Sequence, residues 1–105
     1  MPSTHDKTPQ QNISTVVVLG QMLDIAQAQT LKAELAQCLA SGLAVRLDAR
    51  RVERVDASVL QLLCAFMGAA DTNNVSCVWN DVSPAMRTAV ELTGLNHVLR
   101  LPAAG

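Results

Sequence analysis

A serine stands two residues after an acid, at the start of an apolar helix, in the segment Asp56-Ala57-Ser58-Val59-Leu60. A hydroxyl group at this place could accept a phosphoryl group, which would add a charge of about −1.5 to −2. Exposed amides and the positive end of the helix dipole would partly stabilise that charge, while Asp56 would oppose it. Phosphorylation of Ser58 would therefore change a contact surface without unfolding the domain. The alternative is that Ser58 only caps the helix, a position that serine often occupies.

A second acid stands at the start of another helix. Asp24 is followed three residues later by Gln27, a pair that resembles a capping box, so helix capping alone accounts for this aspartate. Arg50, Arg51 and Arg54 form a basic cluster just before the turn that holds the serine. Such a cluster is typical of a solvated connection, and the alternative is a surface that meets acidic groups of a protein partner.

Other residue types that carry chemistry are sparse and scattered. Cys38, Cys64 and Cys77 lie in apolar segments, which indicates reduced thiols in the core rather than disulfides or a catalytic thiolate. His5 and His97 are far apart, and no cysteine or histidine spacing typical of a metal site occurs. The sequence also lacks a glycine-rich phosphate-binding motif. We therefore expect no cofactor, no metal and no enzymatic activity.

Composition argues against several classes of partner. The 105-residue chain has a formal net charge of −1, and Phe66 and Trp79 are its only Phe, Trp or Tyr residues. It therefore offers neither the basic field nor the stacking platforms of nucleic-acid-binding domains. The longest apolar run, residues 62–70, is far shorter than the ~20 residues that span a bilayer, and no secretory signal is visible. We expect a cytoplasmic protein that neither binds nucleic acid nor inserts into a membrane.

The strands of the domain are indicated by β-branched or alternating apolar runs. They are expected at Val16–Leu19, Ala44–Asp48 and Val75–Trp79, with a turn at Asp71–Asn74 before the last of them. The final apolar segment, Leu95–Leu101, is either a strand or a short helix.

Three helices are expected between and after these strands. The first begins at Asp24 and ends before Gly42, and the second covers Val59–Ala70, which is apolar on nearly every face. The third begins at Ser83-Pro84, a favoured pair for a helix start, and ends at Gly94.

Strands that alternate with helices predict an α/β fold. We expect a mostly parallel or mixed sheet of four to five strands with helices packed on it. Half of the residues are hydrophobic, enough for the core of one domain over residues 14–102. Residues 1–13 are polar and are expected to form a disordered tail, with a short second tail at residues 103–105.

The chain resembles the STAS domain, the module shared by sulphate transporters and bacterial anti-sigma factor antagonists. The resemblance covers about residues 15–101 and implies the same α/β fold. Three stretches carry it, in the order and at the spacing of the family: Leu23–Ile25, then Val45–Asp48 with Val55–Leu63, then Ser83–Met86 with Leu92–Leu95.

The resemblance implies a phosphorylation site and a partner-binding surface. Members of the family typically carry Asp-Ser-Ser-Gly-Leu or Asp-Thr-Ala-Gly-Leu at the second stretch. In the antagonists, the hydroxyl residue before the glycine is phosphorylated by a Ser/Thr kinase that is itself the anti-sigma factor, and the unphosphorylated form binds that kinase. By position, Ser58 matches the phosphorylated residue and Asp56 the leading acid, while Asp24 borders the partner-binding face. The implied partner-binding residues are Asp24, Asp56, Ala57, Ser58 and Val59.

Two positions depart from the family pattern. Val59 stands where the family has a glycine, and Gln21 stands where another glycine is usual, with Gly20 one place earlier. Glycine allows a partner's backbone to approach closely, whereas a β-branched valine does not. Alternatively, Val59 packs inward and leaves an altered but competent partner face.

Three functions compete. The first is a signalling adaptor that binds an anti-sigma factor, a Ser/Thr kinase or a chemosensory kinase through the Ser58 turn. The second follows from similar small STAS proteins, which are regulatory subunits of an ABC transporter that moves phospholipid between bacterial membranes. In those proteins the hydroxyl at the Ser58 position contacts the ATPase subunit, and phosphorylation is not required. The third is a small enzyme that uses Cys64 or Asp56.

Overall fold

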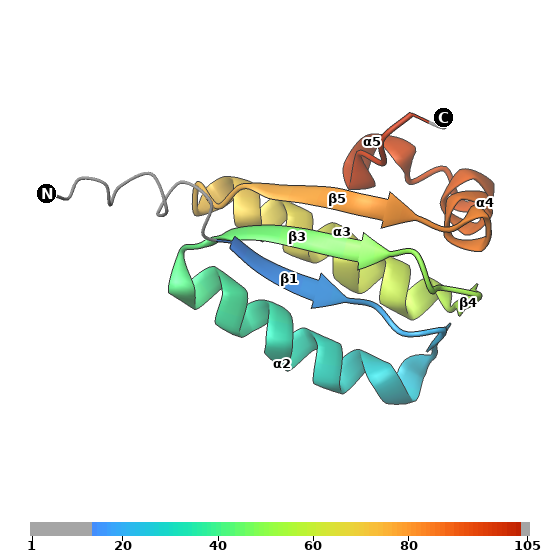
Figure 1. Ribbon diagram of the computed structural model, residues 1–105, viewed down its shortest axis with the longest axis horizontal. Helices are drawn as coiled ribbons and strands as arrows, with labels where there is room; N and C mark the ends of the chain where they lie inside the picture. The colour runs from blue at the N-terminus through green and yellow to red at the C-terminus, as the bar shows by residue number, and fades with distance from the viewer. Residues whose placement is uncertain (1–13, 104–105) are drawn as a thin grey trace, which may run out of the picture.

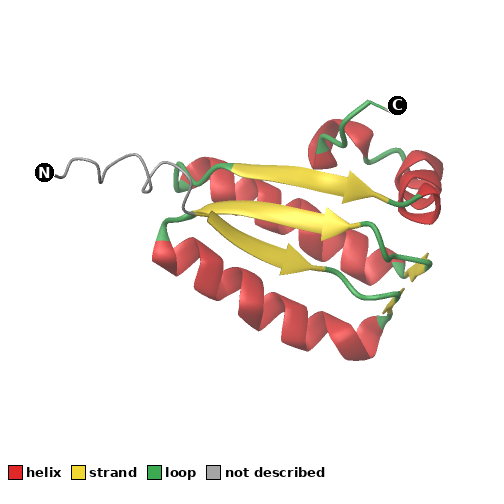
Figure 2. Ribbon diagram, viewed as in Figure 1, coloured by secondary structure: helices red, strands yellow, loops and turns green. Residues whose placement is uncertain are grey.

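Three parallel strands form the sheet of this computed structural model, which describes residues 14–103. β1 (Ser14–Val18), β3 (Ala44–Ala49) and β5 (Cys77–Val82) pair in the order β1-β3-β5. Figures 1 and 2 show that they point toward the same end of the molecule, so the loops that follow them meet there. The predicted α/β class with a mostly parallel sheet is confirmed. The tail predicted for residues 1–13 lies outside the described residues.

Two very short strands form a separate parallel pair beyond the end of the sheet. β2 (Met22–Leu23) pairs with β4 (Arg54–Val55). The five strands of the described residues thus divide into three and two, instead of forming the one larger sheet that we expected. The reason lies in the preceding loops, because the carbonyl of Gln21 accepts the N–H groups of Glu53 and Arg54 at 2.8 and 3.0 Å. The two loops therefore bind each other.

Two of the helices begin and end where the sequence predicts. The helices are α2 (Ile25–Ser41), α3 (Ala57–Thr72), α4 (Pro84–Thr93) and α5 (Asn96–Leu99). Asp24 and Ser83 cap α2 and α4, since each side-chain oxygen accepts the backbone N–H three residues later, at 3.1 and 3.0 Å. Gly42 and Gly94 end these helices with φ of 74° and 71°, a conformation that glycine adopts without strain.

The region between α3 and β5 differs from the prediction. α3 continues to Thr72, so the turn begins two residues later than expected. The N–H of Val75 donates to the carbonyl of Ala70 at 2.8 Å and closes the helix end, so that β5 begins only at Cys77. The final apolar segment forms the short helix α5 rather than a strand.

The core lies on one face of the sheet. Val17, Leu47 and Trp79 lie opposite one another across the three strands and are buried with residues of α2 and α3. α2 and α3 pack against each other, and Figure 1 shows α3 running behind β3 and β5. The indole N–H of Trp79 donates to the carbonyl of Leu99 at 2.8 Å, which fastens α5 to the sheet.

Candidate functional site

The β2–β4 pair brings the starts of α2 and α3 together. Asp24 directly follows β2 and Asp56 directly follows β4, while the N–H of Asp56 donates to the carbonyl of Leu23 at 2.9 Å. The two aspartates line one recess of about 270 Å³ together with Met22, Leu23 and Arg54. Two acids that are far apart in the sequence therefore share one surface.

The side chains of the two aspartates differ in the hydrogen bonds that they make at the starts of their helices. Asp24 caps α2 through its side chain, so the capping interpretation is confirmed for this residue. Asp56 occupies the cap position of α3, but its carboxylate makes no capping hydrogen bond. The N–H groups of Val59 and Leu60 bond to its backbone carbonyl instead, at 3.0 and 3.2 Å. The exposed carboxylate of Asp56 thus makes no hydrogen bond that caps the start of the helix.

Ser58 is the second residue of α3, not its cap. The interpretation that this serine only caps the helix is therefore wrong, because Asp56 occupies that position. Ser58 and its neighbour Ala57 are both exposed. The hydroxyl group thus stands on the first turn of the helix, where the backbone amides and the helix dipole favour an anion.

Val59 lies on the other side of the same turn. Its exposed fraction is 0%, and its side chain belongs to the core. The substitution of the family glycine by valine therefore fills the interior and does not obstruct the surface. Of the predicted partner-binding residues, Val59 does not fit that role in this structure, since its side chain cannot reach a partner.

Two apolar residues of this surface were missed by the sequence reasoning, and Arg54 was predicted only as part of the basic cluster. Met22 lies two residues before Asp24 and Ile25 directly after it, and both side chains are exposed, that of Ile25 to 71%. Arg54 lines the recess with the two acids. An apolar residue beside a cap is expected to be buried, so only the exposure in the structure reveals this pair. We use the name helix-start surface for the exposed residues at the starts of α2 and α3 and in the short strands before them: Met22, Asp24, Ile25, Arg54, Asp56, Ala57 and Ser58.

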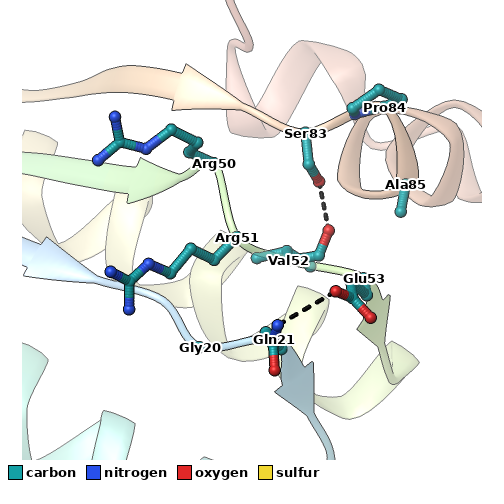
Figure 3. A pocket seen from close by; sticks show the side chains of 9 residues that line it. All are labelled: Gly20, Gln21, Arg50, Arg51, Val52, Glu53, Ser83, Pro84 and Ala85. Atoms are coloured by element: carbon teal, nitrogen blue, oxygen red, sulfur yellow. Dashed lines mark hydrogen bonds between the residues drawn. The ribbon is translucent and has the colours of Figure 1, made fainter.

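The predicted basic cluster is divided by the fold. Arg54 lies on the helix-start surface, while Arg50 and Arg51 line an open cleft of about 810 Å³ at the end of the sheet (Figure 3). Arg50 Nη2 lies 3.5 Å from a carboxylate oxygen of Asp48. Ser83 Oγ donates to the carbonyl of Val52 at 2.6 Å and so joins the arginine-containing loop to the start of α4.

The thiols have the properties of packing groups. Burial raises the pKa of the Cys38, Cys64 and Cys77 thiols, that of Cys77 to about 11, although Arg100 lowers the last in part. A raised pKa leaves less thiolate at neutral pH, which disfavours nucleophilic chemistry. Within residues 14–103, no group of three or more His, Cys, Asp or Glu side chains could hold a metal ion. No helix in the same range is long and apolar enough to cross a membrane.

A comparison of the sequence with models of known protein families identifies the family of this chain. Residues 7–101 match the family model described as "Mlab, STAS domain". The chain belongs to the STAS domain family. No curated protein matches it.

Solved structures share the STAS fold at low sequence identity. The anti-sigma factor antagonist SpoIIAA in its unphosphorylated form superposes with a TM-score of 0.69 and 18% identity, over 90% of this chain and 84% of that chain. An anti-sigma factor antagonist from Mycobacterium paratuberculosis gives 0.69 and 24%, over 85% and 76%. The Bacillus cell fate determinant SpoIIAA in its phosphorylated form gives 0.64 and 20%, over 86% and 81%. At these identities the likeness concerns the fold.

Proposed function

We propose that this STAS domain is a non-enzymatic signalling adaptor, in which the helix-start surface binds a protein partner and phosphorylation of Ser58 controls that binding. One observation carries the proposal: Ser58 is exposed on the first turn of α3, two residues after Asp56, whose side chain lines one recess with that of Asp24. The structural neighbours support it, because they include SpoIIAA in both unphosphorylated and phosphorylated forms. By analogy, the partner is an anti-sigma factor, a Ser/Thr kinase or a chemosensory kinase in the cytoplasm.

The proposed switch acts through charge on a surface that stays folded. A phosphoryl group would add about −1.5 to −2 charges two residues from Asp56. Met22, which lines the recess with Asp56, and Ile25 at the start of α2 are exposed apolar side chains of the helix-start surface. A partner that covers these apolar side chains would have to desolvate the new charge, so its affinity falls. The helix persists because its start favours anions and because Val59 stays anchored in the core.

The first test is the mass of the protein isolated from its native host, with peptide mapping across Ser58. We expect a fraction that is heavier by one phosphoryl group at Ser58, and we expect this fraction to be absent from the Ser58→Ala variant. Protein that carries no phosphate under every growth condition tried would contradict the regulatory part of the proposal.

Capture of the partner tests the binding part. Immobilised protein and the Ser58→Asp variant are compared by quantitative pull-down of the native partner, and the phosphomimetic should bind at least about tenfold more weakly. Ser76→Asp is the matched control, because Ser76 is an exposed serine just before β5, far along the chain from the helix starts. Equal loss in both variants would contradict the role of Ser58. Recovery of an ABC ATPase subunit that binds regardless of phosphate would favour the transporter alternative instead.

A further inference from the structure

The open face of the sheet carries a second surface, which is apolar and basic. Val16, Arg46 and Val78 lie opposite one another in one row across β1, β3 and β5, and Val18 points to the same face two residues farther along β1. Val16, Val18 and Val78 are 48%, 55% and 45% exposed, whereas Val17, Leu47 and Trp79 on the other face are buried. Val16 and Val18 are neighbours on β1, and Val78 lies on β5 beyond Arg46, so the half-exposed valines lie on both sides of this arginine.

Three arginine side chains belong to the same surface as the valines. Arg46 Nη1 donates to the side-chain oxygen of Asn80 at 3.0 Å, a neutral partner that leaves the arginine charged. Arg50 reaches back to Asp48, which alternation along β3 places on the same face as Arg46. Figure 3 shows Arg51 running in the same direction as Arg50 and away from Ser83. Asp48 meets them, and the exposed Asp81 of β5 lies on the same face, because its neighbour Val82 pairs with the buried Ala49. These groups give the face a formal charge of 3 − 2 = +1, in a chain whose net charge is −1.

We propose that this open-sheet surface, formed by Val16, Val18, Arg46, Arg50, Arg51 and Val78, binds an acidic segment of a protein partner in which carboxylates alternate with apolar side chains. Guanidinium groups match carboxylates in geometry as well as in charge, and the valines supply apolar contact between them. A strand-like segment presents side chains to one face at every second residue, which suits the rows of the sheet.

A membrane fits this surface less well than a protein. Surface-binding helices insert large apolar or aromatic side chains beside many cations, and the open-sheet surface has only valines and three arginines. The helix-start surface, which carries two aspartates, cannot serve the same acidic segment because like charges repel. The open-sheet surface is therefore a second docking site, independent of the Ser58 proposal.

The test is a titration of the full-length, 15N-labelled protein with a 12-residue peptide of alternating glutamate and valine, followed by NMR. The control peptide has lysine in place of glutamate. We expect the acidic peptide alone to shift the backbone signals of β1, β3 and β5 and of the loop at Arg50 and Arg51. We also expect its affinity to fall as salt is raised, because screening weakens exposed charge pairs.

Variants locate the site. Arg46→Glu should lower the affinity for the acidic peptide at least about tenfold, and Val18→Thr, which keeps a β-branched side chain, should lower it by a smaller factor. Lys32→Glu is the matched charge reversal on α2 and should change nothing. Signal dispersion of each free variant verifies its fold.

Four results would overturn the inference. The first is the absence of shifts, and the second is equal binding of both peptides. The third is movement of the open-sheet signals with protein concentration alone, which would assign the surface to a second copy of the chain. The fourth is Arg46-dependent binding to phosphatidylglycerol vesicles without peptide binding, which would assign it to a membrane.

Discussion

At the scale of single residues, two neighbours on one helical turn have opposite surroundings. Ser58 is exposed and Val59 is completely buried, although they are adjacent in the sequence. A helix turns by about 100° per residue, so consecutive side chains face different directions. The family glycine can therefore be replaced by valine without any change to the surface that presents the hydroxyl group.

Replacement of this valine by glycine tests the assignment. Val59→Gly should reduce the free energy of unfolding by about 2 to 4 kcal/mol, because it removes a buried side chain and adds the backbone entropy of glycine. The measurement is denaturation followed by the fluorescence of Trp79, the single tryptophan. Ala57→Gly, an exposed position on the same turn, should cost about 1 kcal/mol or less. Equal stability of Val59→Gly and the parent would contradict the packing role.

At the scale of secondary-structure elements, the pairing of β2 with β4 places the starts of α2 and α3 side by side and so forms the helix-start surface. It holds only two residues of each segment, yet it fixes the direction from which α2 and α3 begin. The carboxylate of Asp24 accepts a capping hydrogen bond, whereas the carboxylate of Asp56 accepts none, so the two side chains contribute differently to stability. The carboxylate of Asp56 is the one that is available for a partner.

Substitutions of the two acids should separate stability from binding. Asp24→Ala should destabilise the protein by about 1 kcal/mol, whereas Asp24→Asn, which can still cap, should stay within about 0.5 kcal/mol of the parent. Asp56→Ala should cost less than about 0.5 kcal/mol, since it removes no capping hydrogen bond. Urea denaturation of the three variants side by side provides the comparison. A larger loss for Asp56→Ala than for Asp24→Ala would refute the assignment of the caps.

At the scale of the whole molecule, charge is separated between two surfaces. The helix-start surface presents two aspartates with one arginine, and the open-sheet surface presents three arginines with Asp48 and Asp81. A chain of nearly zero net charge thus offers surfaces of opposite character to partners.

We expect the Cys77 thiol to make the stability of the folded protein fall as pH rises in the alkaline range. Its pKa in the folded protein, about 11, lies above the value near 9 of an unperturbed thiol, so folding favours the protonated form. The contribution is fully present below pH 9 and is lost as pH rises from about 9 to about 11; because the thiol is partly exposed and screened by water, the loss is on the order of 1 kcal/mol. Denaturation at pH 8, 9, 10 and 11 should show this loss, and Cys77→Ala should reduce it. An unchanged pH dependence in the variant would contradict the prediction.

Features that depend on neighbouring residues could be predicted from the sequence alone. Helix starts at Asp24 and Ser83 and helix ends at Gly42 and Gly94 follow from capping, which acts over three or four residues. The order of strands and helices follows from apolar periodicity, and this order leads to the α/β class. Ser58 was identified in the same way, from its place in a local segment.

Which distant segments meet, and which faces are covered, could be learned only from the three-dimensional structure. The pairing of β2 with β4 brings Asp24 and Asp56 onto one surface, and no local pattern encodes that pairing. Periodicity groups Val16 with Val18 and separates them from Val17, but it does not say which of the two faces the helices cover. The exposure of Ile25 and the burial of Val59 also depend on packing between elements, because a side chain is buried only when another part of the chain lies over it.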